Sequence, residues 1–228
     1  VLGGDGAILR ACRQLASTQR PILGVNLGHL GFLADLSVEE FRQNLPAIRD
    51  REYRVTQHLM FECHHVTSDG NTERITGLNE VALSAGASLT MLDIRLEIDG
   101  EEVTTFSGDG VIISSPGGST AHSRSAGGPI LRQDLQAFVV TPLNPHTLNN
   151  RPLVDRADRR YTLTMDEVPE GVTLVVDGQL RRPFAEGDAI HVVQSQQSFQ
   201  LARIPGHSYY SALRNKLGWS GQVRGRGR

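Results

Sequence analysis

A change of sequence pattern near Tyr53 constrains the fold of this chain most strongly. Beyond this residue, short segments with alternating apolar and polar residues follow one another, separated by Asp-Gly and Gly-Asp pairs. Such alternation is typical of half-buried strands, and Asp-Gly pairs favour tight hairpin turns. We therefore expect an all-β domain of the β-sandwich type over residues 56–203. The segments predicted as strands are 53–67, 73–84, 91–98, 102–106, 111–114, 136–141, 160–166, 171–177, 189–194 and 198–203.

The first residues follow a different pattern, which favours an α/β domain. Val1-Leu2 has the character of the end of a buried strand, a glycine-rich turn follows at 3–6, and residues 7–16 carry apolar side chains at helical spacing. Residues 21–26 predict a second strand. We therefore expect an incomplete, Rossmann-like α/β domain over 1–55, with further chain before Val1 in the natural protein or in a complete relative.

Ser37 marks the predicted start of another helix. It stands three residues before Glu40, the spacing of a capping box in which each side chain bonds the backbone of the other residue. A helix that begins here would turn Phe41, Leu45 and Ile48 inward.

The C-terminal residues are not predicted to form strands. Residues 208–219 are compatible with a helix. The last residues, 221–228, read GQVRGRGR, and a polar run of this kind is typical of a disordered tail.

The composition limits the possible function classes. A formal net charge of −2 argues against a general nucleic-acid-binding protein. Cys12 and Cys63 have no metal-ligand spacing and indicate free thiols in a reducing compartment. No apolar run approaches the ~18–20 residues of a membrane span, and no signal peptide is recognised. These features predict a cytoplasmic protein.

The stretch 107–131 is unusually rich in glycine and in small hydroxyl residues. Asp109 stands between two glycines ahead of the apolar run 111–113, and a short helix is predicted over 119–126. Buried hydroxyl groups need hydrogen-bond partners, and glycine lets the backbone approach a neighbour closely. The stretch is therefore either a surface loop or a binding site for a phosphate-bearing ligand, built from backbone N–H groups and hydroxyls.

Several polar residues outside this stretch have two interpretations. Asp5, between a strand and a helix, either caps the helix or takes part in chemistry as a metal ligand or proton acceptor. Asn79-Glu80 is either a simple cap or a ligand-binding pair, and His29 is either structural or a ligand contact. Asp177-Gly178 fits a tight hairpin turn.

The order of the polar motifs adds information that no motif gives alone. The motifs are, in order, Gly3-Gly4-Asp5-Gly6, Asn26 to Leu33, Asn79-Glu80, Asp109-Gly110, Gly118 to Ala121, Asn144 to Leu148, and Asp177-Gly178-Gln179. This ordered series resembles the NAD kinases, whereas the GGDG turn alone also occurs in phosphofructokinases and lipid kinases. The resemblance covers residues 1–203. It implies an α/β domain and a β-sandwich with the active site in the crevice between them, and residues 204–220 returning to the first domain.

The resemblance also implies an activity. NAD kinases transfer the terminal phosphoryl group of ATP, or of polyphosphate in some members, to the 2′-hydroxyl of the adenosine ribose of NAD, which gives NADP. Mg²⁺ is expected to bind with the nucleotide, and no metal is expected to be held by the protein alone. The implied assembly is a homodimer or homotetramer, without nucleic-acid or membrane partners.

Carried over residue by residue, the resemblance implies that Asp5 is the catalytic base. Gly3, Gly4 and Gly6 are expected at the phosphates. The implied NAD-binding residues are Asp5, Gly6, Asn79, Glu80, Thr90, Ser107, Asp109, Thr120, Ala121, His122, Ser123, Arg124, Ser125, Asn144 and Gln179.

Two positions depart from the pattern of the NAD kinases. Gly117 stands where the family usually has Thr or Ser, and His122 stands where it usually has an aromatic residue, most often Tyr. Two other functions stay open: a lipid kinase of the diacylglycerol or sphingosine kinase type, and a degenerate kinase that binds NAD without catalysis. The polar motifs argue against the acyl pocket that a lipid kinase needs.

Overall fold

The computed structural model describes residues 1–28, 31–86, 90–146 and 151–218. The chain forms two compact units, which we describe separately. The first unit comprises Val1–Gln57 and Gln200–Arg228, and the second comprises His58–Phe199. The predicted disordered tail, 221–228, lies outside the described residues.

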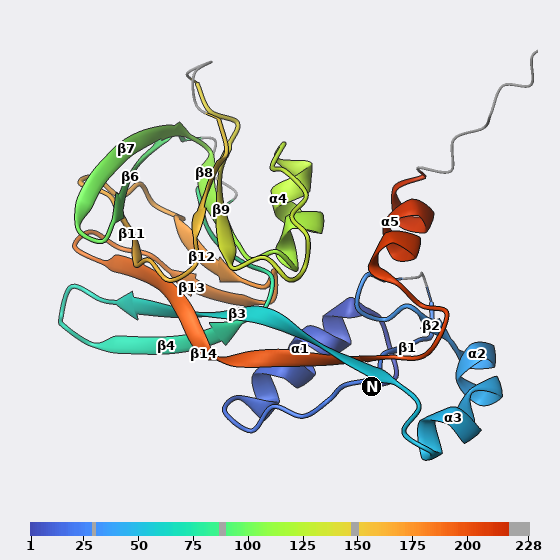
Figure 1. Ribbon diagram of the computed structural model, residues 1–228. Coiled ribbons are helices and arrows are strands. Elements are labelled where there is room, and N and C mark those ends of the chain that lie inside the picture. Colours follow the sequence, from blue (N-terminus) through green and yellow to red (C-terminus); the bar gives the residue numbers. More distant parts are fainter. Residues whose placement is uncertain (29–30, 87–89, 147–150, 219–228) are drawn as a thin grey trace, which may run out of the picture. The chain divides into compact units, whose positions relative to one another are not determined.

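The first unit is mixed α/β and small (Figure 1). Its two short strands pair in parallel, and the bridges Leu2–Val25 and Ile22–Leu201 extend this pairing to both ends of the chain. The first helix buries Ile8, Leu9 and Cys12, which confirms the amphipathic pattern seen in the sequence. The elements are α1 Asp5–Leu15, β1 Val25–Asn26, β2 Leu36–Ser37, α2 Val38–Gln43, α3 Leu45–Arg49 and α5 Tyr209–Leu217.

The predicted helix after Ser37 begins as expected but is shorter. The capping box is confirmed, because the Glu40 N–H donates to Ser37 Oγ and the Ser37 N–H donates to Glu40 Oε2. The helix then stops at Asn44, and a second helix starts with Pro46 in its first turn. Proline lacks the N–H that a continuous helix needs, so the segment divides. Leu45 is 47% exposed, so its predicted inward position is wrong.

The second unit contains two six-stranded sheets with antiparallel pairs such as β5 with β8 and β6 with β7. The first residues of β3, 54–57, and the last of β14, 200–203, belong to the first unit. One sheet has the order β10-β9-β8-β5-β12-β13, and the other has the order β4-β3-β14-β11-β6-β7. The predicted fold class, an α/β part followed by an all-β sandwich, is confirmed. The strands are β3 Arg54–Val66, β4 Thr72–Gly77, β5 Glu80–Ser84, β6 Leu92–Ile98, β7 Glu101–Gly108, β8 Gly110–Ser114, β9 Ala137–Leu143, β10 Leu153–Arg156, β11 Tyr161–Thr164, β12 Thr173–Val176, β13 Leu180–Pro183 and β14 Ala189–Arg203.

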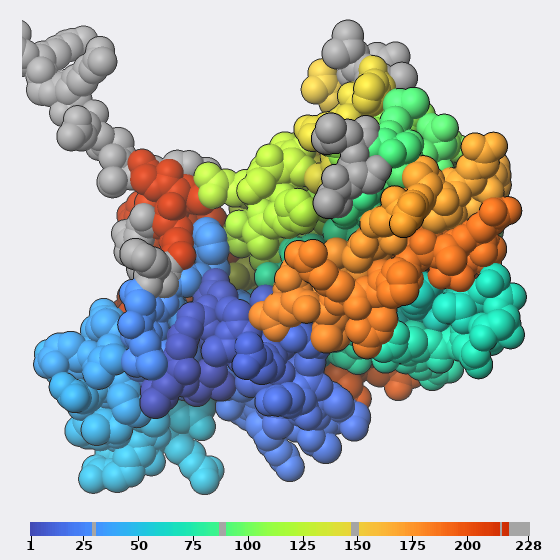
Figure 2. Space-filling view, turned by 180° about the vertical axis from the view of Figure 1, so that it is seen from behind, coloured from blue at the N-terminus to red at the C-terminus, as the bar shows by residue number. Residues whose placement is uncertain are grey.

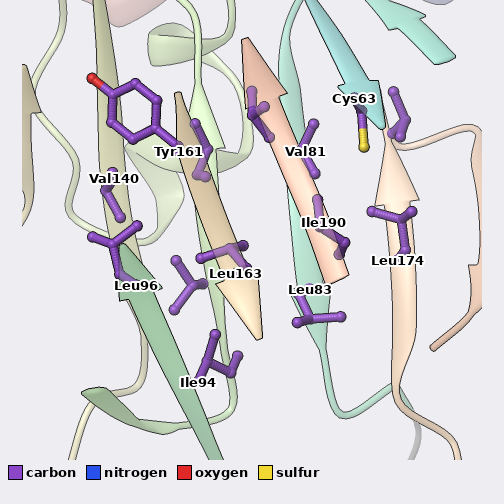
Figure 3. Packing of buried hydrophobic residues seen from close by; sticks show 14 of the residues in the cluster. Cys63, Val81, Leu83, Ile94, Leu96, Val140, Tyr161, Leu163, Leu174 and Ile190 are labelled. Carbon is purple, nitrogen blue, oxygen red and sulfur yellow. The ribbon is translucent and has the colours of Figure 1, made fainter. Parts of the chain in front are cut away.

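A hydrophobic core lies between the two sheets. Figure 3 shows Leu83 and Leu174 of the first sheet directed into the same space as Leu96 and Leu163 of the second. All four side chains are fully buried. The alternation of apolar residues therefore directs one face of each sheet into the core.

Several strand boundaries differ from the prediction. The segment 73–84 divides into β4 and β5, which belong to different sheets, while 189–194 and 198–203 join into the single strand β14. Strands β10 and β13 were not predicted. The helix expected over 119–126 is a 3₁₀ turn, η1 Gly118–Thr120, followed by the four-residue helix α4 His122–Ser125.

The core accounts for much of the stability of the second unit. We expect Leu83→Ala, at a fully buried position, to lower the free energy of unfolding by about 2–5 kcal/mol. The matched control is Leu135→Ala, whose side chain is 44% exposed and should change it by about 0.5 kcal/mol or less. Urea unfolding followed by circular dichroism measures both; equal losses would contradict this account of the core.

Candidate active site

Asp5 is the first residue of α1, and its carboxylate is bound by the backbone of a distant loop. Its Oδ2 accepts from the N–H of Phe32 at 2.8 Å, and its Oδ1 accepts from the N–H groups of Leu33 and Ala34 at 3.0 and 2.9 Å. The N-cap of α1 is Gly4, which makes no side-chain capping bond. The interpretation of Asp5 as a helix cap is therefore wrong.

Glycine is required where the loop approaches this carboxylate. A Cβ at Gly31 would lie 1.8 Å from Asp5 Oδ1, closer than any two such atoms can approach. The Gly31 N–H donates to the Ala34 carbonyl at 3.0 Å, which closes the loop into a turn. Three consecutive N–H groups then point to the same two oxygens.

A second carboxylate, that of Asp177, is held in the same way. It accepts from the N–H groups of Leu78, Asn79 and Glu80 at distances between 2.7 and 3.3 Å. Asp177 and Gly178 have φ of +51° and +65°, and the Gln179 N–H donates to the Val176 carbonyl at 3.0 Å. The predicted hairpin turn is thereby confirmed, and its first residue also fixes the backbone of the Asn79-Glu80 pair.

The carboxyl group of Glu80 has a strongly raised pKa. Its side chain is buried, 5% exposed, and its Oε2 has no hydrogen-bond partner within the described part of the chain. Burial raises the pKa of Glu80 to about 8, and the neighbouring Asp177 carboxylate acts in the same direction. A buried carboxyl with an unpaired oxygen is typical of a functional site.

The glycine-rich stretch packs against the same backbone. The Ser115 N–H donates to the Asn79 carbonyl at 2.9 Å, and Ser115 Oγ donates to the Leu78 carbonyl at 2.5 Å. A Cβ at Gly118 would lie 2.1 Å from the Asn79 carbonyl oxygen, so this contact needs glycine. Within the second unit, the structure thus brings together three sequence motifs: 78–80, 114–120 and 177–179.

Several hydroxyls of the glycine-rich stretch bond to the protein itself. Ser119 Oγ donates to the Pro116 carbonyl, and Thr120 Oγ1 donates to the Gly117 carbonyl. Ser123 is fully buried and bonds Thr141 at 2.9 Å. Of the other positions of this stretch that the resemblance implied, Ala121 is half-buried and His122, Arg124 and Ser125 are exposed.

The remaining positions implied by the resemblance lie in both units. Asp109 is exposed and accepts from the Asn144 amide at 2.6 Å. Ser107 donates to Asp93. Thr90 and Gln179 are exposed in the second unit, Gly3 is half-buried and Gly4 and Gly6 are exposed in the first, and His29 lies outside the described residues.

Two features are absent from the described residues. No group of three or more His, Cys, Asp or Glu side chains among them is placed to hold a metal ion. No helix among them is both long and apolar enough to cross a membrane.

Sequence reasoning missed three features of the site. The turn interpretation of Asp177 was correct, but nothing in the sequence shows that its carboxylate binds residues 78–80. The loop residues 32–34 were recognised only as part of a motif. Arg203, which contacts this loop, carried no signal.

The chain is similar to proteins of known activity over nearly its whole length. The family described as ATP-NAD kinase N-terminal domain matches residues 1–53, and the ATP-NAD kinase C-terminal domain matches residues 78–204. An NAD kinase of Rhodopirellula baltica is 45% identical over 98% of this chain and 72% of its own length. An NAD kinase of Geotalea daltonii is 38% identical over 96% of this chain and 77% of its own length.

Solved structures show the same relationship. A yeast NADH kinase complexed with NADH superimposes with a TM-score of 0.91 and 27% identity, over 99% of this chain and 68% of that one. An NAD kinase from Archaeoglobus fulgidus in complex with ATP has a TM-score of 0.79 and 29% identity, over 96% of this chain and 82% of that one.

The raised pKa of Glu80 predicts how stability depends on pH. The carboxyl has a pKa of about 8 in the folded state against 4.5 for an unperturbed glutamate, so between these pH values the folded state binds one proton more than the unfolded state. Its contribution is fully present below pH 4.5 and is lost as the pH rises through 8. We expect stability to fall over this window by an amount on the order of a few kcal/mol.

Urea unfolding at pH 5, 7 and 8.5 measures this dependence. Glu80→Gln should remove it, while Glu102→Gln, at a side chain that is 63% exposed, should leave it unchanged. A Glu80→Gln profile parallel to that of the unchanged protein would contradict the assignment.

Proposed function

The chain belongs to the NAD kinase family, and we propose that it transfers the terminal phosphoryl group of ATP to the 2′-hydroxyl of the adenosine ribose of NAD, which gives NADP. The observation that carries the proposal is the Asp5 carboxylate at the start of α1, which is fixed by the three N–H groups of residues 32–34. Both halves of the family pattern match, which favours this function over the lipid-kinase alternative.

ATP is the donor we propose, supported by a structural relative described in complex with ATP. Polyphosphate is a second donor to be tested. The yeast relative is described with NADH, so the reduced dinucleotide is a second acceptor to be tested.

Asp5 is proposed to act as the base on the 2′-hydroxyl. A carboxylate has about four acceptor positions, and the amides of Phe32, Leu33 and Ala34 occupy three of them. The fourth, on Oδ2, can accept from a substrate hydroxyl. Phosphoryl transfer depends mainly on positioning and charge neutralisation, so a fixed acceptor suits a proton that leaves late in the transfer.

Asn79 and Glu80 are proposed to bind the diphosphate-and-ribose side of NAD. Oε2 of Glu80, which has no partner among the described residues, supports this role, because a carboxyl group that is protonated at neutral pH can accept from one hydroxyl of a ribose diol and donate to the other. Asp177 fixes the backbone of both residues. Their position then depends little on side-chain motion.

The other positions have proposed roles that depend on the resemblance. Gly3, Gly4 and Gly6 lie at the N-terminal end of α1, where backbone N–H groups favour phosphate. Asp109, supported by Asn144, is proposed at the nicotinamide end. The remaining proposed contacts to the dinucleotide are Thr90, Ser107, Thr120, Ala121, His122, Ser123, Arg124, Ser125 and Gln179.

Mg²⁺ is proposed to enter with the nucleotide. It would neutralise phosphate charge during transfer. Mg²⁺ at such sites is usually held by substrate phosphate oxygens and water together with one or two carboxylates. We further propose a cytoplasmic location. We also propose a homodimeric or homotetrameric assembly, whose mass light scattering of the purified protein would measure.

The role of Asp5 is tested by Asp5→Asn. We expect NADP formation from NAD, ATP and Mg²⁺ to fall by about 10²–10⁴-fold, because the general base is lost. NAD binding, measured by calorimetry, should persist. Unchanged turnover would refute the role, and loss of NAD binding would show that Asp5 acts mainly in binding.

The role of Glu80 is tested by steady-state kinetics of Glu80→Ala. The Michaelis constant for NAD should rise by about tenfold or more, since an acceptor for the ribose hydroxyls is lost, while that for ATP should change little. Glu102→Ala serves as the exposed control. Equal increases for both substrates would argue against this placement.

A further inference from the structure

Arg203, the last residue of β14, contacts both ends of the segment Phe32–Asp35. One guanidinium nitrogen, Nη1, donates to Asp35 Oδ2, and the other, Nη2, donates to the Phe32 carbonyl at 3.3 Å. The Arg203 side chain is 6% exposed and that of Asp35 is 13% exposed. All of these residues belong to the first unit.

The same segment supplies the three N–H groups that bind the Asp5 carboxylate. Its N–H groups at Phe32, Leu33 and Ala34 point to the Asp5 carboxylate, while the Phe32 carbonyl and the Asp35 side chain are bound by Arg203. The segment is thus held between Asp5 and Arg203, so a shift of the segment also shifts the donors that orient Asp5.

Other residues near the C-terminus support this arrangement. His207 lies between two carboxylates, with Nδ1 3.7 Å from Asp35 Oδ2 and Nε2 3.6 Å from Glu40 Oε1. The ammonium group of Lys216 in α5 lies 5.5 Å from the centre of the Phe32 ring. Figure 2 shows the red residues of α5 beside the blue chain of the first unit.

The charges around Asp35 explain why a cation is needed here. Burial raises the pKa of the Asp35 carboxyl, whereas Arg203 and His207 lower it and Glu40 acts weakly in the direction of burial. A buried carboxylate requires a partner that stays charged, and arginine does so at every physiological pH.

We propose that Arg203 is a positioning residue for Asp5 and acts through the segment Phe32–Asp35. The proposal rests on the proposed role of Asp5 as base. Two donors in a rigid fork are needed to reach the carboxylate and the carbonyl together, and lysine supplies only a point charge. Arg203→Lys therefore keeps the ion pair with Asp35 and weakens the hold on the Phe32 carbonyl.

The test is a double-mutant cycle of Arg203→Lys with Asp5→Asn, followed by NADP formation at saturating NAD and ATP. Arg203→Lys alone should lower kcat by about 10–100-fold, since small misplacements of a reacting group have effects of this size, with the KM for NAD within about twofold. In the Asp5→Asn background, Arg203→Lys should cause no further loss, because the group that it positions is already absent.

Hydrogen exchange supplies a readout besides activity. The amides of Phe32, Leu33 and Ala34 should exchange faster in Arg203→Lys, and the rest of the first unit should keep its protection. The matched control is Arg182→Lys in the second unit, where Nε and Nη2 hold Glu73 at 2.8 and 2.7 Å. This variant should leave kcat and the exchange of residues 32–34 unchanged.

The outcomes separate this proposal from that for Asp5. Full turnover in Asp5→Asn alone would overturn the role of Asp5 and, with it, that of Arg203. Two other results would overturn the role of Arg203 alone. One is a loss of turnover in Asp5→Asn together with full turnover in Arg203→Lys, and the other is an equal effect of Arg203→Lys on turnover in both backgrounds. If Arg203→Lys does not fold, Asp35→Asn replaces it with the same expected results. Failure of both variants to fold would overturn the proposal in favour of a purely structural role.

Discussion

Backbone N–H groups that converge on one carboxylate are the interaction on which the candidate site depends. They occur twice, at Asp5 with the amides of 32–34 and at Asp177 with the amides of 78–80. Hydrogen bonds to an ionised acceptor are roughly twice as strong as neutral ones, and backbone donors carry no side-chain entropy to lose. One set joins the loop 32–34 to α1, and the other joins residues 78–80 to the β12–β13 turn.

Close backbone approach is the second constraint, and it follows from the first. The loop can reach Asp5 only because Gly31 has no Cβ, and the glycine-rich stretch can reach Asn79 only because Gly118 has none. The same compactness removes water from Glu80, which explains its raised pKa and makes its unpaired oxygen a group that a ligand could satisfy. In the second unit, the close backbone approach therefore accounts both for the position of residues 78–80 and for the raised pKa of Glu80.

The local part of this account could be predicted from the sequence, whereas the long-range part could not. Alternation and Asp-Gly pairs predicted most strands, and the Ser37–Glu40 spacing predicted a capping box that the structure contains. The hydrogen bonds between the N–H groups of residues 78–80 and the Asp177 carboxylate join positions almost a hundred residues apart, and no sequence periodicity predicts such a contact. A helix cap stayed one of two interpretations of Asp5, because local rules cannot show a loop 27 residues away that binds its carboxylate. The gap predicted within β14 arose because strand pairing uses backbone groups and tolerates polar residues such as Ser195.

The central claim is that this chain phosphorylates the 2′-hydroxyl of NAD. The most direct measurement is ³¹P NMR of the product after the purified protein is incubated with NAD, ATP and Mg²⁺. The account predicts one new phosphomonoester signal, which coincides with that of added NADP and is accompanied by equimolar ADP. No new signal while NAD still binds, or a phosphoryl group at a position other than the 2′-hydroxyl, would contradict it.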